Sequence, residues 1–309
     1  QPGEEAVLDG ADPVTGWEAG PGGFFKAHLA LDLADQNQIF LGRDMLTEAR
    51  WPDSRSLLQP VRAVAASGTA NTLTDPQLPG PDDCWKGAVL WCAGGERWHC
   101  WSAVVTAFDA ATHTLTFEKP QPEMWYTPRQ GSEYVLMGVR AALDAEGEWF
   151  LDRDSRELWL KAPGGRHPDG LGIEAKRRLH VMDLSGRSYL RVSGLRFRAG
   201  GILTDARSSH LLFQGLKGEY LGHSYVNDIS SSGTVLIRGH HIELNGCELA
   251  FASGSLLRVE GSDNRVINCF LHEGNYAGQW SGAVSLSGRR HLVSHNTIRG
   301  SGRDVCSIH

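Results

Sequence analysis

The sequence lacks several features that would assign it to a common class of protein. No stretch contains eighteen consecutive apolar residues, so we expect no membrane-spanning helix. The 30 basic residues are scattered among 36 acidic ones and the net charge is −6, which argues against a nucleic-acid-binding surface. Apolar residues make up 41% of the chain and charged residues 21%, a composition that excludes a disordered chain.

The short motifs of several enzyme classes are also missing. The sequence contains no GxSxG elbow, no CxxC pair and no glycine-rich loop that leads from a strand into a helix. We therefore expect no organic cofactor and no bound metal. The six cysteines are too sparse for a disulfide scaffold and are expected to be free thiols; a metal cluster of Cys84, Cys92, Cys100 and His99 is the alternative.

Glycine, by contrast, is abundant. It accounts for 37 of 309 residues, about 12% against a usual value of roughly 7%, which indicates frequent turns. Ten tryptophans and thirteen histidines suit a neutral polar ligand such as a sugar, because aromatic rings stack on C–H surfaces. An aromatic-rich core would explain the same composition.

The first half of the chain contains short β-rich segments separated by turns. Residues 27–33 and 38–41 predict strands, and the turn-forming residues of 66–81 mark the entry to a separate unit. Residues 87–139 predict a small antiparallel barrel or sandwich, and residues 147–160 a hairpin. Five tryptophans of the antiparallel unit fit half-buried strands better than a sugar-stacking surface: Trp85, Trp91, Trp98, Trp101 and Trp125.

A repeat governs the chain after residue 178. Equivalent apolar positions are separated by 21, 31, 22 and 27 residues, and they are Val192, Phe213, Leu244, Val266 and Val293. About 22 residues form one coil of a parallel β-helix, and the longer intervals indicate inserted loops. Equivalent positions would stack in ladders, so Cys247 is expected to lie over Cys269 inside the stack as a free thiol.

The sequence thus predicts an all-β protein, a parallel β-helix with a small antiparallel β domain inserted in its N-terminal half. The expected divisions are 1–66 (N-terminal coils and flanking strands), 67–140 (inserted domain) and 141–309 (parallel β-helix, incomplete at its C-terminal end). Residues 306–309 begin a new coil without a polar or helical cap. Since solenoid ends need covering, we expect further coils or a second chain there.

Several segments together resemble a known family. They are residues 2–12, 49–52, 147–152 with 158–160, and 295–298. The chain resembles right-handed parallel β-helix enzymes that degrade polysaccharides outside bacterial cells, and looks most like glycoside hydrolases related to the α-L-fucosidase and xylanase group. The resemblance implies a right-handed β-helix, a carbohydrate substrate and an extracellular or periplasmic bacterial location.

Candidate site residues lie in the loops between coils, at 219–232, at 271–282 and at the C-terminal tail. Glycoside hydrolysis needs two carboxyl groups, one as acid and one as base or nucleophile. We expect the catalytic acids among Glu273, Asp304 and Asp228. Five further residues are expected to bind sugar, by stacking or by contacts with hydroxyls: Trp280, Tyr276, His272, Arg303 and His309.

Two other functions remain open. A polysaccharide lyase would act on a uronic-acid polymer with a basic residue and a calcium ion, and Arg303, Asp304 and His309 could serve it. A non-catalytic solenoid for glycan binding or adhesion is the second alternative, because the family's catalytic acids lie on later coils and match no diagnostic motif here.

Overall fold

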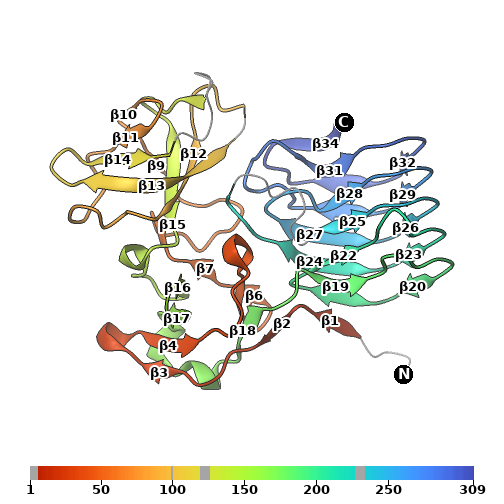
Figure 1. Ribbon diagram of the computed structural model, residues 1–309, viewed down its shortest axis with the longest axis horizontal. Coiled ribbons are helices and arrows are strands. Elements are labelled where there is room, and N and C mark those ends of the chain that lie inside the picture. The colour runs from red at the N-terminus through yellow and green to blue at the C-terminus, as the bar shows by residue number, and fades with distance from the viewer. Residues whose placement is uncertain (1–5, 99, 119–125, 227–233) are drawn as a thin grey trace.

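The computed structural model describes residues 6–98, 100–118, 126–226 and 234–309 (Figure 1). They form strands, turns and short 3-10 segments, without an α-helix in the described ranges. The expected all-β class is confirmed. Within this part of the chain no helix is long and apolar enough to cross a membrane.

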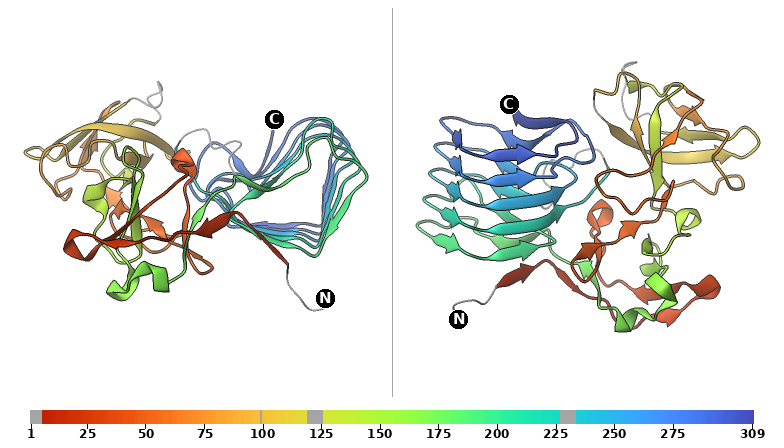
Figure 2. Two further views of the ribbon diagram at one scale, coloured as in Figure 1. Left: turned by 60° about the horizontal axis from the view of Figure 1, so that its bottom comes forward. Right: turned by 180° about the vertical axis from the view of Figure 1, so that it is seen from behind.

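Three parallel sheets contain the strands of the C-terminal half together with β1 from the N-terminus. The first contains β1 (Val7–Asp9), β21 (Arg196–Arg198), β24 (Lys217–Gly222), β27 (Glu248–Ala252), β30 (Phe270–His272) and β33 (Thr297–Arg299). The second contains β19 (His180–Asp183), β22 (Gly201–Leu203), β25 (Val235–Ile237), β28 (Leu257–Val259), β31 (Gly282–Leu286) and β34 (Asp304–Ile308). The third contains β20 (Arg191–Ser193), β23 (Leu212–Gln214), β26 (Glu243–Asn245), β29 (Arg265–Ile267) and β32 (Leu292–Ser294). From β19 onward the chain therefore visits each sheet once per coil, and the coils lie over one another as the coil stack (Figure 2).

The register of the third sheet matches the sequence repeat. Val192 pairs with Phe213, Phe213 with Leu244, Leu244 with Val266, and Val266 with Val293. The side chains of Phe213, Leu244 and Val266 are buried in the core of the stack, together with Cys247 and Cys269. All six cysteines are free thiols, as expected.

An antiparallel sheet forms the inserted unit. Its order is β10 (Ser67–Gly68), β11 (Thr72–Thr74), β14 (Thr114–Phe117), β13 (Trp101–Asp109), β12 (Val89–Ala93), β15 (Glu133–Met137) and β8 (Arg50–Trp51), and β9 (Ala63–Val64) also pairs with β15. Trp85, Trp91 and Trp101 are buried, whereas Trp98 is exposed and Trp125 lies outside the described residues. Packing therefore accounts for most of this tryptophan cluster.

Two smaller sheets connect the inserted unit to the coil stack. One contains β3 (Glu18–Ala19), β4 (Phe25–His28), β17 (Glu157–Leu160), β16 (Glu148–Asp152) and β7 (Thr47–Glu48). The other contains β2 (Ala11–Pro13), β18 (Ile173–Lys176), β5 (Ile39–Leu41) and β6 (Asp44–Met45). The expected hairpin at 147–160 is the β16–β17 pair.

These sheets occupy ranges that the expected divisions assign to N-terminal coils with flanking strands (1–66) and to the start of the parallel β-helix (141–309). Within the described residues 6–66 only β1 joins the coil stack, and the stack resumes at β19 rather than at residue 141. Residues 147–160 fold back as a hairpin that pairs with β4, so they cannot pass through three sheets as a coil does.

The coil stack and the antiparallel sheets are in direct contact. The indole Nε1 of Trp91 donates a 2.8 Å hydrogen bond to the carbonyl oxygen of Ala277, and the amide of Cys100 donates one of 2.8 Å to Gly278. Loops between coils therefore reach the antiparallel side of the molecule, where the principal cavities lie.

Candidate functional site

A cavity of about 310 Å³ lies where the coil stack meets the antiparallel sheets. We call it the junction cavity. Its polar and aromatic lining includes Asp35, Glu48, Trp149, Arg153 and Tyr225. These residues come from a 3-10 segment, from strands β7 and β16, from the turn after β16 and from the chain after β24. No local stretch of sequence could form this site alone.

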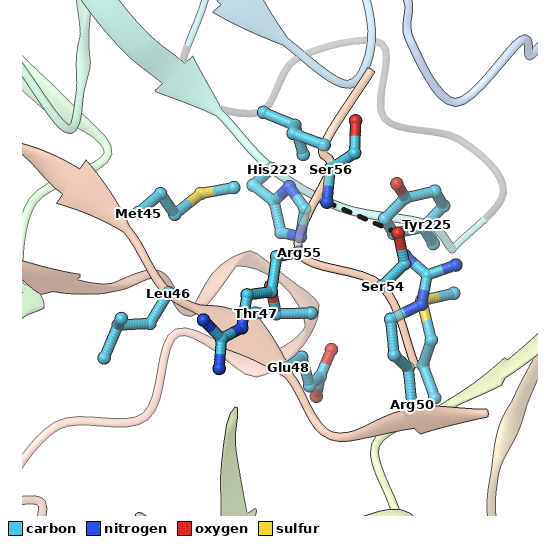
Figure 3. Close-up of a pocket in the computed structure, with 12 residues that line it drawn as sticks. Met45, Leu46, Thr47, Glu48, Arg50, Ser54, Arg55, Ser56, His223 and Tyr225 are labelled. Atoms are coloured by element: carbon cyan, nitrogen blue, oxygen red, sulfur yellow. Dashed lines mark hydrogen bonds between the residues drawn. The ribbon is translucent and has the colours of Figure 1, made fainter. Parts of the chain in front are cut away.

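Next to it is a void of about 30 Å³, which Glu48 and Tyr225 also line. Figure 3 shows His223 and Tyr225 of the coil stack on one side, with Glu48 and Arg50 of β7 and β8 on the other. Glu48 therefore lines both this void and the junction cavity.

Glu48 is the unusual acid of the junction cavity. Burial raises the pKa of its carboxyl group to about 7; the charge of Arg153 opposes this shift and that of Asp35 adds to it. Near neutral pH a substantial fraction of Glu48 is therefore protonated. A carboxylic acid in that state can donate a proton to a leaving oxygen.

Asp35 provides a second carboxyl group. It lies in the 3-10 segment Ala34–Gln36, and its Oδ2 accepts a hydrogen bond from the hydroxyl of Ser224. Ser224 is buried, its amide donates a 2.8 Å hydrogen bond to the hydroxyl of Ser253, and its hydroxyl accepts one of 3.1 Å from the amide of Val226. The coil stack therefore holds an acid that belongs to the N-terminal segment.

Two ring side chains of the coil stack, His223 and Tyr225, line the smaller void beside Glu48. The ring centroid of His223 is 5.3 Å from that of Tyr225 and 5.8 Å from that of Tyr276, and Nδ1 of His223 is 2.5 Å from the Tyr276 hydroxyl. Burial, with the nearby charges of Lys176 and Arg50, lowers the pKa of His223 to about 3. His223 is consequently neutral and acts here as a hydrogen-bonding group.

Tyr276 and its loop neighbours were expected to contact sugar directly. Tyr276 is half-buried, and its hydroxyl is bonded to His223. Trp280 is 60% exposed, and the guanidinium carbon of Arg303 lies 4.0 Å from its ring centroid. Arg303 also binds Asp304, with 2.5 Å between Nη1 and Oδ2. Trp280, Arg303 and Asp304 thus form one group, in which Trp280 is exposed and the other two residues are half-buried.

The other expected site residues lie elsewhere. Nη2 of Arg299 is 3.8 Å from Oε1 of Glu273. His272 stacks on Phe270 at 4.2 Å between centroids, and its Nε2 is 3.5 Å from Oε1 of Glu248. His309 is exposed at the end of the described chain. Asp228 lies outside the described residues.

The acids Glu48 and Asp35 were missed because nothing in their spacing links them to the coil loops. Glu48 directly precedes residues 49–52, one of the segments that carry the family resemblance, and this was the available signal.

A further acidic group, Asp53, Asp144 and Glu148, is the one set within the described ranges whose oxygens are close enough together to hold a metal. Burial raises the pKa of Glu148 to about 7, and two backbone amides oppose this shift.

Comparison with known proteins shows a likeness in fold to a solved structure. No protein-family model matches the chain, and no curated protein matches it. A solved structure described as "Glycoside hydrolase" aligns with a TM-score of 0.64 and 13% identity over 95% of this chain. The match covers 66% of that structure's chain, so the present chain spans just under two thirds of its neighbour's length. At this level of identity the likeness shows that the fold is glycoside hydrolase-like.

Proposed function

We propose that this chain belongs to a glycoside hydrolase that binds a glycan in the junction cavity and cleaves it with Glu48 and Asp35. The observation that carries the proposal is that two carboxyl groups line one cavity and that one of them holds a proton near neutral pH. The structural neighbour described as a glycoside hydrolase supports the reaction class.

In this mechanism Glu48 protonates the glycosidic oxygen as the bond to the leaving sugar breaks. Asp35 stabilises the positive charge on the sugar and acts as base toward water or as nucleophile. Tyr225 provides a ring on the cavity wall for the C–H face of a sugar. A volume of about 310 Å³ is at the small end of ligand sites, which suits a short glycan segment.

We also propose that the coil stack is a right-handed parallel β-helix, and the repeated order of strands through three sheets supports this. We place the chain with the α-L-fucosidase and xylanase group. We further propose that the protein acts outside the cytoplasm, in an extracellular or periplasmic location.

Glu273, Asp304 and Asp228 remain the alternative set of catalytic acids. One observation favours this set: Asp304 binds Arg303, which lies against the exposed ring of Trp280, and a sugar ring could stack on such a ring. The two sets can be separated by the same assay.

The experiment measures reducing ends released from a panel of polysaccharides. Glu48→Gln and Asp35→Asn are expected to lower kcat by about a hundredfold or more. Asp154→Asn, which neutralises an exposed acid in the β16–β17 turn, is the control and should keep full activity. Glu273→Gln and Asp304→Asn test the alternative set.

The results of these assays would distinguish the two sets of acids and the three candidate functions. Full activity in Glu48→Gln with loss in Glu273→Gln or Asp304→Asn would move the site to the alternative acids. Release of an unsaturated uronide, detected by its ultraviolet absorbance, would replace the hydrolase by the lyase. Binding of a glycan without turnover would leave a glycan-binding protein.

A further inference from the structure

The group of Asp53, Asp144 and Glu148 lies apart from the junction cavity. One carboxylate oxygen of each is within 4.8 Å of the others. Glu148 pairs with Thr47 across the parallel β7–β16 contact, and successive residues of a strand point to opposite faces. Glu148 and Glu48 therefore project from opposite faces of the same sheet. A second cavity of about 540 Å³ borders Asp53 and Glu148 on the Glu148 side.

The bonding of Glu148 is independent evidence for a ligand. Glu148 is 3% exposed, and its Oε2 accepts hydrogen bonds of 3.3 Å from the Asp144 amide and 3.2 Å from the Ala145 amide. Its Oε1 is buried and has no hydrogen-bond partner among the described residues. A buried carboxyl oxygen without a partner is costly, and a cation bound at this atom would remove that cost.

Among the described residues, no side chain donates a hydrogen bond to Oε1 of Glu148. In the described part of the chain none of the three carboxylates takes part in an ion pair. The nearby Lys161 ammonium donates its hydrogen bond to the backbone carbonyl of Asp144 rather than to a carboxylate. The positive charge of Arg50 lies close enough to interact with Glu148, but without a hydrogen bond.

We propose that Asp53, Asp144 and Glu148 bind a divalent cation of the calcium type. Carboxylate oxygens on loops of adaptable geometry are the ligands that calcium takes, and the exposure of Asp53 and Asp144 leaves room for water in the remaining positions. The cation fixes the chain after β8 to the turn before β16. It thereby links the antiparallel sheet of the inserted unit to the sheet that contains the β16–β17 hairpin.

The test uses chelator-treated protein and calcium chloride alone. Calorimetric titration of the wild type should give saturable binding, and calcium should raise the melting temperature. Glu148→Gln is expected to weaken calcium binding by about tenfold or more and to remove the rise in melting temperature. Glu146→Gln is the matched control, because it neutralises an exposed acid at the same cavity without removing a proposed ligand.

A second measurement separates loss of a ligand from loss of folding. Without calcium, Glu148→Gln should melt no lower than the wild type, because the amide replaces a buried charge. Wild-type protein that shows no saturable calcium binding would overturn the inference. Equal calcium binding by the Glu148→Gln and Glu146→Gln variants would overturn it as well. Neither readout depends on hydrolase activity, so the inference stands or falls separately from the proposed function.

Discussion

The hydroxyl of Ser224 donates a hydrogen bond to Oδ2 of Asp35, although 189 residues separate them in the sequence. Ser224 follows strand β24 of the coil stack, whereas Asp35 lies in a 3-10 segment of the N-terminal part. The contact therefore connects two parts of the fold and holds an acid at the wall of the junction cavity.

Replacing Ser224 by Ala should destabilise the protein. The variant leaves the half-buried Asp35 carboxylate and the Val226 amide without their partner, and a hydrogen bond to a charged group contributes about 1.5–3 kcal/mol. Urea denaturation measures the change in the free energy of unfolding. Ser193→Ala, an exposed serine of β20, is the control. Equal effects of the two substitutions would show that the Ser224 contact contributes nothing specific.

Glu48 should make stability depend on pH. The pKa of Glu48 is about 7 in the folded protein against an ordinary 4.5, so the folded state holds the proton more tightly than the unfolded chain. Its contribution is complete below pH 4.5 and is lost as the pH rises through 7. Urea denaturation of Glu48→Gln across this range should lack that decline. Parallel curves for wild type and variant would contradict the assignment.

Lys176 should also make the free energy of unfolding depend on pH, but with the opposite sign. Burial lowers its pKa from 10.5 to about 7, while its Nζ donates hydrogen bonds to Gln38 and Leu221. Above pH 7 the unfolded chain holds the proton and the folded protein does not, so the free energy of unfolding rises with pH. Lys176→Met should flatten this rise. The measurement compares urea denaturation between about pH 7 and pH 8.5, below the ordinary pKa of cysteine.

Truncation in the coil-stack core should be costly. Phe213 is 1% exposed in β23, whereas the adjacent Leu212 is half-buried. Phe213→Ala is expected to lower the free energy of unfolding by about 3–5 kcal/mol, because it opens a cavity between coils. Leu212→Ala, on the opposite face of the strand, should cost less. A larger loss for Leu212→Ala would mean that the two faces are assigned the wrong way round.

The repeat of the coil stack could be predicted because each coil buries an equivalent residue. Phe213, Leu244 and Val266 occupy equivalent sequence positions and pair in register in the structure. The hairpin of β16 and β17 could also be predicted from the sequence, because its two strands are joined by a short turn. Trp280 and Arg303 were singled out separately, and the structure brings them together.

The N-terminal strands could not be placed in this way, because they pair with segments far along the chain. Strand β4 pairs with β17, and β2 pairs with β18. Such pairings depend on register and burial across the whole sheet rather than on a local pattern. For this reason the expected divisions 1–66 and 141–309 do not show that the regular coils begin only at β19.

The sequence by itself determined the all-β class, the register of the coil stack and the hairpin, since short-range patterns of apolar residues and turns encode them. Only the tertiary structure decided which acids share a cavity and which acid keeps its proton. The pKa of Glu48 depends on its burial and on Arg153 and Asp35, which come from separate segments of the chain. Desolvation and long-range contacts exist only after these segments have packed together.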